Sequence, residues 1–434
     1  MTRRFSHRGA TTQRLQTVFC AALHIVIAIP AAAQSAQHTR EEGTTEVQKD
    51  EGRKWFVMEE RPSIRFGDAV RVDFTGKLDL AVRTFGDSDT DTQMDQRRIG
   101  IDGRLFDVLG FQVERDLGDD KQPWRDVFVE LRKWRAMRAK AGRFKVPFGQ
   151  ERLTSVSDLD FAGRSIASEA LTSGRDTGLE LSGRVFGRVL TYMAGVFQHD
   201  GDVSRGGTDA PGDRTVAARV VTTPLLWTSS RALRRLEVGL GMTAGDVPEG
   251  LNGLRARTSS GYVAVAPVYV AGRRLRFGAD ASFVNGPVSI KGEVLEARDQ
   301  RRRQGLRDED LPEVVARGWY LSGTSFVVGR LKSSGAPRTP LGRHGIGALQ
   351  LAARVESLAF GSDAAGEPPF RNPRAANVLS NDIRGATFGV NWFPVRFVKT
   401  QWNVIREHLQ DPERRPDPAR PWSTGTVFRV QFAM

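Results

Sequence analysis

Basic side chains at alternate positions are the residues of this sequence with the clearest chemistry. In the stretch "AVRVDFTGKLDLAVR", Arg71 and Lys77 share one face with other polar residues if the stretch forms a β-strand. A guanidinium group is planar and can donate two parallel hydrogen bonds to a phosphate-like anion. The same alternation selects Arg98, Arg104, Arg132 and Arg138. We therefore expect these cations to attract anions, provided that they face one common space.

Other reactive residue types give weaker signals. His38, His199, His344 and His408 lack the partner spacing of a metal site or of a nucleophile's general base. No Gly-rich phosphate loop, zinc signature or paired-cysteine motif is present in the sequence. The "DSDTD" run at 87–91 could hold calcium, although acidic turn residues explain it more simply. We expect no cofactor, no metal and no enzyme activity.

The first 33 residues predict a secretory signal peptide. A basic head without acids is followed by the apolar run "LQTVFCAALHIVIAI" and by small residues up to a cleavage site near Ala33. Cys20 is the only cysteine and lies inside this segment. The exported chain therefore has no disulfide to stabilise it, and a fully hydrogen-bonded barrel would be another means of closure.

The overall charge narrows the class of partner. The chain of 434 residues has a formal net charge of +13, which often indicates nucleic acid binding. An exported protein does not meet nucleic acid, so lipopolysaccharide or a small anion is the better expectation. With 39% hydrophobic and 26% charged residues, the composition fits a globular or barrel protein and not a disordered one.

The rest of the chain reads as a succession of strands. Residues 34–63 are charged and lack periodicity, and we interpret them as a periplasmic lead-in. From 64 to 434, alternating runs are joined by links that are short and long in turn, as in outer-membrane barrels. About seventeen runs are present, but Pro267 interrupts "YVAVAPVYV" (262–270). Assigning that run to an outer link leaves about sixteen strands.

The apolar faces of these strands need a covering. Few stretches of the sequence could form helices, and no second sheet is evident that would bury so many apolar faces. An exported chain can bury them in lipid, with the charged faces turned to the lumen. The predicted fold class is therefore all-β, a transmembrane antiparallel barrel of about 16 strands over residues 64–434.

One long link differs from the others. Residues 145–176 form the third outer loop and carry too many apolar residues for a solvated tip: Pro147, Phe148, Leu153, Leu159, Phe161 and Ile166. Such a loop must pack against something, and in a wide barrel the lumen wall is available. We expect it to fold inward as a constriction. It adds the cations Lys145, Arg152, Arg164 and Arg175 to the expected pore lining.

The chain also resembles a known family. "GRFKVPFGQERLTSVSDLDFAGRS", "QRRIGIDGRLF" and "GVNWFP" are similar to segments of the phosphate-selective porins O and P, and the similarity extends over about 65–434. The resemblance implies a sixteen-stranded barrel, usually trimeric, with the third loop folded inward. It also implies a lumen lined with arginine and lysine that draws anions through.

These observations lead to one expected function. We expect a porin in the outer membrane of a Gram-negative bacterium, in contact with lipid and lipopolysaccharide, that passes small anions such as phosphate or polyphosphate. Lys145 and Arg152 beside the narrowing should matter most, followed by Arg98 and Arg71. Neighbouring acids such as Asp73 could instead balance these charges and leave a general pore. Two different classes of protein compete with this expectation: a structural or adhesive barrel with an occluded lumen, and an outer-membrane hydrolase.

Overall fold

The structure is a computed structural model of the chain. It describes residues 56–58, 61–67, 69–86, 90–187, 189–201, 214–251, 254, 256–259, 261, 263–265, 267–332, 335–342, 344–362, 381–415 and 417–434. The predicted signal peptide, His38, most of the lead-in 34–63 and residues 87–89 of the "DSDTD" run lie outside these residues.

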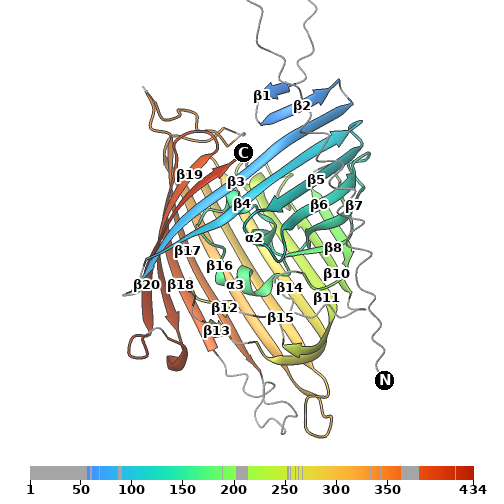
Figure 1. The fold of residues 1–434 in the computed structure, drawn as a ribbon, viewed down its shortest axis with the longest axis vertical. Coiled ribbons are helices and arrows are strands. Elements are labelled where there is room, and N and C mark those ends of the chain that lie inside the picture. Colours follow the sequence, from blue (N-terminus) through green and yellow to red (C-terminus); the bar gives the residue numbers. More distant parts are fainter. Residues whose placement is uncertain are drawn as a thin grey trace, which may run out of the picture. The chain divides into compact units, whose positions relative to one another are not determined.

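Sixteen antiparallel strands form one closed sheet (Figure 1). They are β3 (Val70–Phe85), β4 (Asp91–Leu105), β5 (Leu109–Asp116), β6 (Trp124–Leu131), β7 (Arg138–Lys145), β8 (Arg175–Val185), β9 (Leu190–Phe197), β10 (Thr215–Thr222), β11 (Leu236–Leu251), β14 (Tyr269–Asn285), β15 (Val288–Arg301), β16 (Leu311–Val328), β17 (Ala348–Ser362), β18 (Asn381–Phe393), β19 (Val398–Leu409) and β20 (Trp422–Ala433). Each pairs with the next, and β20 pairs with β3 to close the barrel. The predicted sixteen-stranded barrel is confirmed.

Two short strands lie outside the barrel, and one of them pairs with backbone groups of β3 that no barrel strand on that side pairs with. β1 (Phe56–Met58) pairs with β2 (Pro62–Phe66), and β2 pairs with the first residues of β3. The pairing of β3 with β20 begins only at Lys77, so β2 covers backbone groups that would otherwise form an unpaired edge. Residues in 56–63, expected to lack regular structure, thus include strand.

Other segments depart from the expected links. The polar stretch 84–96 suits a long link, yet the hairpin of β3 and β4 extends into it, and Arg83 donates to Gln93 at 3.3 Å. Such a cross-strand pair lets polar residues form strand. Within 262–270, β13 (Val263–Val265) pairs with β12 (Ala256–Arg257) outside the barrel sheet, as expected for a link, whereas Tyr269 and Val270 already belong to the barrel strand β14.

The described helices are all short. They are α2 (Gln150–Leu153), η1 (Val156–Asp158), α3 (Ile166–Leu171), η2 (Leu233–Arg235) and η4 (Pro412–Arg414). Among the described residues, no helix has both the length and the apolar character needed to span a membrane.

The barrel is apolar outside and polar inside. In the stretch "AVRVDFTGKLDLAVR" (69–83), apolar and polar residues alternate. Leu78 and Leu80 are 47% and 39% exposed, whereas Asp79 between them is fully buried. The largest fully buried side chains of the described residues include Arg274, Arg276, Arg301 and Arg429. A sheet in water would show the reverse burial, so the exposed apolar face is the one that suits lipid.

Candidate functional site

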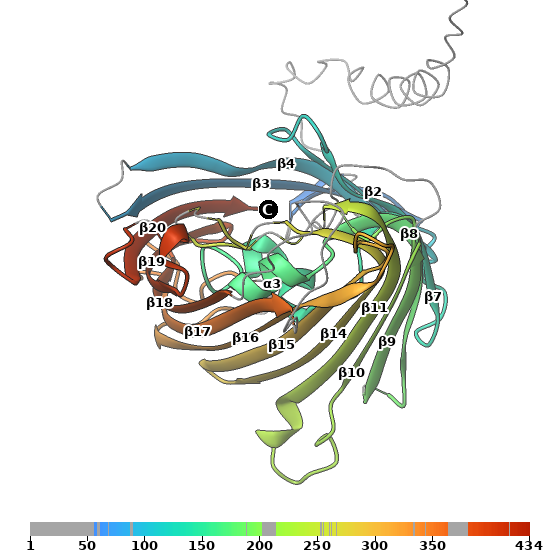
Figure 2. The same ribbon diagram turned by 90° about the horizontal axis from the view of Figure 1, so that it is seen from below.

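The 145–176 segment joins β7 to β8 and carries α2, η1 and α3. In Figure 2, α3 lies within the ring of strands. Its residues Ile166, Ala167 and Leu171 belong to an apolar cluster with Leu295 of β15 and Leu358 of β17. Of the six apolar residues that set this segment apart in the sequence, Phe148 and Ile166 belong to this cluster and pack against the barrel wall.

Carboxylates bind the backbone N–H groups of this segment. Glu293 of β15 accepts a hydrogen bond from Gln150 N, and Glu356 of β17 accepts one from Ile166 N, each at 2.6 Å. Within the segment, Glu151 accepts 2.8 Å hydrogen bonds from both the N–H and the hydroxyl of Ser165. An irregular backbone away from water needs such partners.

Basic and amide side chains of the same wall bind the carbonyl groups of the segment. Arg354 of β17 donates to Gly163 O at 3.1 Å, and Arg429 of β20 donates to Ala162 O at 2.9 Å. Lys399 of β19 donates to Ser157 O at 3.4 Å. The polar face of β15 to β20 is therefore engaged in holding the segment.

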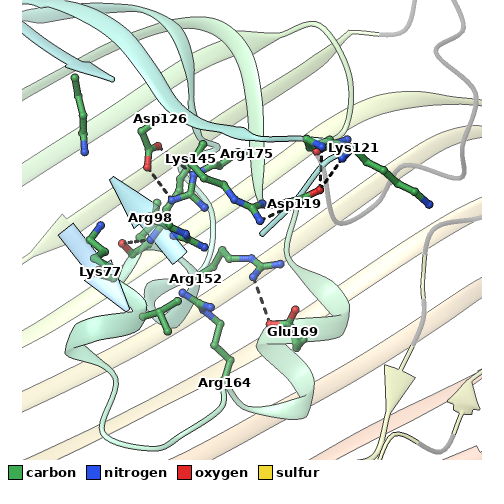
Figure 3. A pocket seen from close by; sticks show the side chains of 17 residues that line it. Lys77, Arg98, Asp119, Lys121, Asp126, Lys145, Arg152, Arg164, Glu169 and Arg175 are labelled. Carbon is green, nitrogen blue, oxygen red and sulfur yellow. Dashed lines mark hydrogen bonds and ion pairs between the residues drawn. The ribbon is translucent and has the colours of Figure 1, made fainter. Parts of the chain in front are cut away.

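A cavity of about 570 Å³ lies on the other side of the segment, and eight of its seventeen lining residues are cations (Figure 3). We call it the basic cavity. Its cationic lining residues are Lys77, Arg98, Lys121, Arg125, Lys145, Arg152, Arg164 and Arg175, and its acidic ones are Asp119, Asp126 and Glu169. The cations outnumber the acids, so the cavity carries an excess of positive charge when all groups are ionised.

Some of these cations are paired with carboxylates. Arg98 lies 3.0 Å from Asp116 and 3.3 Å from Glu114. Arg175 lies 2.8 Å from Asp126. Because each of these guanidinium groups has an acid at contact distance, they contribute less to the net field in the cavity than their number implies.

Lys145 and Arg164 are held differently, by backbone carbonyls. Lys145 Nζ donates to Leu153 O and Thr154 O, both at 2.9 Å. Arg164 donates to Glu151 O at 3.2 Å and to Thr154 O at 3.0 Å. Burial lowers the pKa of the Arg164 guanidinium to about 10, and the charge of Arg152 adds to the shift. The carbonyls orient the Arg164 guanidinium without placing a full negative charge beside it.

Arg152 has unused hydrogen-bonding capacity. Its Nη1 donates to Glu169 at 3.3 Å, and the Glu169 side chain is 60% exposed. Its Nε and Nη2 are buried and have no hydrogen-bond partner among the described residues. A buried donor without a partner is costly, and an anion that displaced the neighbouring groups and reached these two atoms would satisfy both.

The structure places the ten predicted cations at two levels. Six line the basic cavity: Lys77, Arg98, Lys145, Arg152, Arg164 and Arg175. The other four lie at or next to the strand ends that carry the first short links: Arg71, Arg104, Arg132 and Arg138. Arg71 lies 2.8 Å from Asp73, and Arg132 pairs with Glu130, so local acids balance both.

Two further cations line the basic cavity, and strand alternation in the sequence does not select them. Lys121 lies in the link between β5 and β6, and Arg125 is the second residue of β6. The run "DDKQPWRD" indicates only a polar link, although Arg125 lies directly before the cavity residue Asp126. Its charge density was the available signal.

Two histidines, His199 and His408, lie where the barrel strands β9 and β19 meet the links that follow them. His199 Nδ1 lies 3.5 Å from an oxygen of Asp176. The His408 ring packs against Trp422, with ring centroids 5.0 Å apart. Among the described residues, no group of three or more His, Cys, Asp or Glu side chains is arranged to hold a metal ion.

A second cavity, of about 610 Å³, adjoins the first. We call it the aromatic cavity, since Phe326, Phe393 and Phe397 are part of its lining. Lys77 and Ser155 line both cavities. The two spaces therefore meet beside the 145–176 segment.

Comparisons with known proteins agree with this architecture. OmpT, an outer membrane protein of Vibrio cholerae, is 13% identical and superposes with a TM-score of 0.56, covering 85% of this chain and 99% of its own. Its trimer form gives a TM-score of 0.52 at 13% identity, over 84% and 100% of the two chains. An anion-selective porin from Comamonas acidovorans gives 0.53 at 14% identity, over 84% and 100%. At such identities the similarity shows the fold.

The family comparison is more specific. No curated protein matched the chain. Residues 65–434 match the family described as phosphate-selective porin O and P, which is most of the sequence and the whole barrel from β3 to β20. The chain therefore belongs to the phosphate-selective porin O and P family and is an outer-membrane channel of the porin type.

Proposed function

We propose that the protein is an anion-preferring pore for passive diffusion of small solutes, including phosphate-like anions, and that the 145–176 segment narrows its lumen. The observation that carries the proposal is the set of three cations at the basic cavity. Lys145 and Arg164 are held by carbonyls, and Arg152 buries two donors without a protein partner among the described residues. All three lie in the 145–176 segment, and Lys145 is its first residue.

Electrostatics favours these cations over those on the strands. A lumen with low-dielectric walls focuses the field of its charges on a passing ion. Charges at a narrowing act within the screening length of about 8–10 Å, so salt weakens them little. The Comamonas acidovorans porin, which is described as anion-selective, is consistent with this function in the same fold.

The test is the reversal potential of the channel in a planar bilayer under a salt gradient. The wild type should prefer anions, and K145Q/R152Q should shift the potential towards cation preference. The matched control R104Q/R138Q removes two cations from the short-link ends and should leave the potential nearly unchanged. A cation-preferring wild type, or a K145Q/R152Q pore that behaves like the wild type, would contradict the proposal. A folded barrel without conductance would favour a structural barrel with an occluded lumen.

We also propose that the channel is a homotrimer. Strands β5, β6, β7, β9 and β10 each have 8 residues, fewer than the roughly 9–11 that a strand needs to cross a bilayer. A neighbouring copy packed against these short strands would shield them from lipid. The OmpT structure described as a trimer form has the same fold. Cross-linking and native mass measurement in detergent should give three copies, and a monomer would contradict the proposal.

Export is proposed from the sequence. We infer that residues 1–33 are removed and that the mature barrel lies in the outer membrane among lipid and lipopolysaccharide. N-terminal sequencing of the purified protein should begin near residue 34. Cell fractionation should recover it as a heat-modifiable band in the outer membrane, and recovery in the soluble periplasm would contradict the inference.

A further inference from the structure

The aromatic cavity has one apolar wall and one charged wall. Phe326 of β16 and Phe393 of β18 both contribute, and their ring centroids lie 5.9 Å apart in a tilted arrangement. Phe326 pairs with Gln350, and Phe393 pairs with Ala348, and both partners are buried. The two rings therefore lie on the inner face of the barrel, where porin strands usually carry polar residues.

Cations stand beside these rings. Lys399 Nζ lies 5.6 Å from the centroid of the Phe393 ring. Arg61 and Lys77 also line the cavity, with Asp158 and Asp160 from the 145–176 segment, and Lys77 Nζ is paired with Glu114 at 2.5 Å. Arg61 lies 3.3 Å from Asp102 at an exposed position, a pairing that contributes little in water. The cavity thus offers an aromatic surface within reach of positive charge.

The position of the cavity gives it a role in passage. Lys77 and Ser155 line both cavities, so the aromatic cavity adjoins the basic cavity at these two residues. Val395 and Phe397, in the link between β18 and β19, line the far end. A purely inorganic anion gains nothing from the phenylalanine rings.

From this juxtaposition we propose that the aromatic cavity is a second solute site that selects small aromatic carboxylates. The ring of such a solute packs on Phe326 and Phe393, and its carboxylate faces Lys77 and Arg61. Aromatic pairs prefer centroid separations of about 4.5–7 Å in offset or edge-to-face arrangements, which a flat ring can reach beside two phenylalanines. The inference rests on the proposed anion preference and names the solute class within it.

The experiment compares three carboxylates as inhibitors of the chloride current through single channels in a planar bilayer. Benzoate and cyclohexanecarboxylate share charge and approximate size but differ in aromaticity, and acetate lacks the ring. In the wild type, benzoate should act at about two- to twelvefold lower concentration than cyclohexanecarboxylate. Acetate should be the weakest of the three.

Variants locate the effect. F326L/F393L keeps apolar bulk but removes both rings, and it should abolish the difference between benzoate and cyclohexanecarboxylate. The matched control F388L/F428L changes two phenylalanines on the exposed outer face and should keep the difference. Folding of each variant is checked by heat modifiability, and the wild-type comparison is decisive by itself if a variant does not fold.

The outcomes separate the two proposals. Equal inhibition by benzoate and cyclohexanecarboxylate in the wild type would overturn this inference, as would a difference that survives in F326L/F393L. Either result would mean that the phenylalanines only pack the wall. An anion-preferring channel without benzoate preference leaves the proposed function intact, whereas a cation-preferring channel contradicts the proposed function itself.

Discussion

Arg152 differs from its neighbours because its charge and its hydrogen-bonding geometry can be separated. Two of its buried N–H groups have no partner among the described residues. Replacing Arg152 by Lys keeps the charge but removes the planar fork. We expect R152K to retain the reversal potential of the wild type while phosphate inhibits the chloride current about tenfold less. That change matches the loss of one charge-assisted hydrogen bond of roughly 1.5 kcal/mol.

The control for this prediction is R138K. Arg138 is the first residue of β7, at the opposite end of the strand from Lys145. Unchanged phosphate inhibition in R152K would mean that Arg152 acts only as a point charge.

For single residues, the sequence could predict which side chains face the inside of the barrel, but not their position along the barrel axis. Alternation assigns Arg71 and Lys77 to one face, yet only Lys77 lines the basic cavity. Height along a strand depends on the stagger between neighbours, and bulges such as the one between Asp79 and Leu80 shift that stagger. The pairing of Arg71 with Asp73, by contrast, is local, because residues two apart in β3 lie on the same face of the strand.

Among the elements, the 145–176 segment can be tested by removing it. Its ends lie together, since a Cβ placed on Gly149 would be 2.7 Å from Thr172 Cγ2. Deleting 150–170 removes α2, η1 and most of α3, but leaves every barrel strand intact. We expect a larger single-channel conductance, and a barrel that still folds because water can reach the polar wall that the segment covered.

A deletion within the link 302–310 between β15 and β16 serves as control, because that link lines neither cavity among the described residues. Its conductance should match that of the wild type. Unaltered conductance after deletion of 150–170 would show that the segment does not set the bore.

The apolar content of this segment was enough to predict that it packs against a wall. The identity of its partners could not be predicted. Ile166 N donates to Glu356, and Arg429 donates to Ala162 O, across 190 and 267 positions of sequence. Such pairs depend on the closure of the whole barrel, which local patterning does not encode.

At the scale of the whole molecule, the exposed apolar surface should behave as a lipid contact. Phe428 of β20 is exposed, and on a soluble protein a charge there would be tolerated. On a lipid-facing strand, F428R should lower the free energy of unfolding by roughly 2–4 kcal/mol near the bilayer midplane. Urea unfolding in lipid vesicles measures this change.

The matched control is F66R. Phe66 is also exposed, but it is the last residue of β2, outside the barrel strands. We expect little loss of stability there. Equal stability of F428R and the wild type would contradict a lipid-facing outer surface.

The two sides of the barrel wall have different roles, and this difference has a consequence for engineering. The inner charges of β15 to β20 hold the 145–176 segment, and several of the cations beside β3 to β8 line open space. Tolerance to substitution should therefore be uneven around the circumference. A library that randomises Lys121, Arg125 and Arg152 should yield pores of varied ion preference, whereas one that randomises Arg354, Glu356 and Arg429 should yield barrels in which the 145–176 segment is no longer held against the wall. The permeation properties of this barrel could then be redesigned on one wall while the other supplies the scaffold.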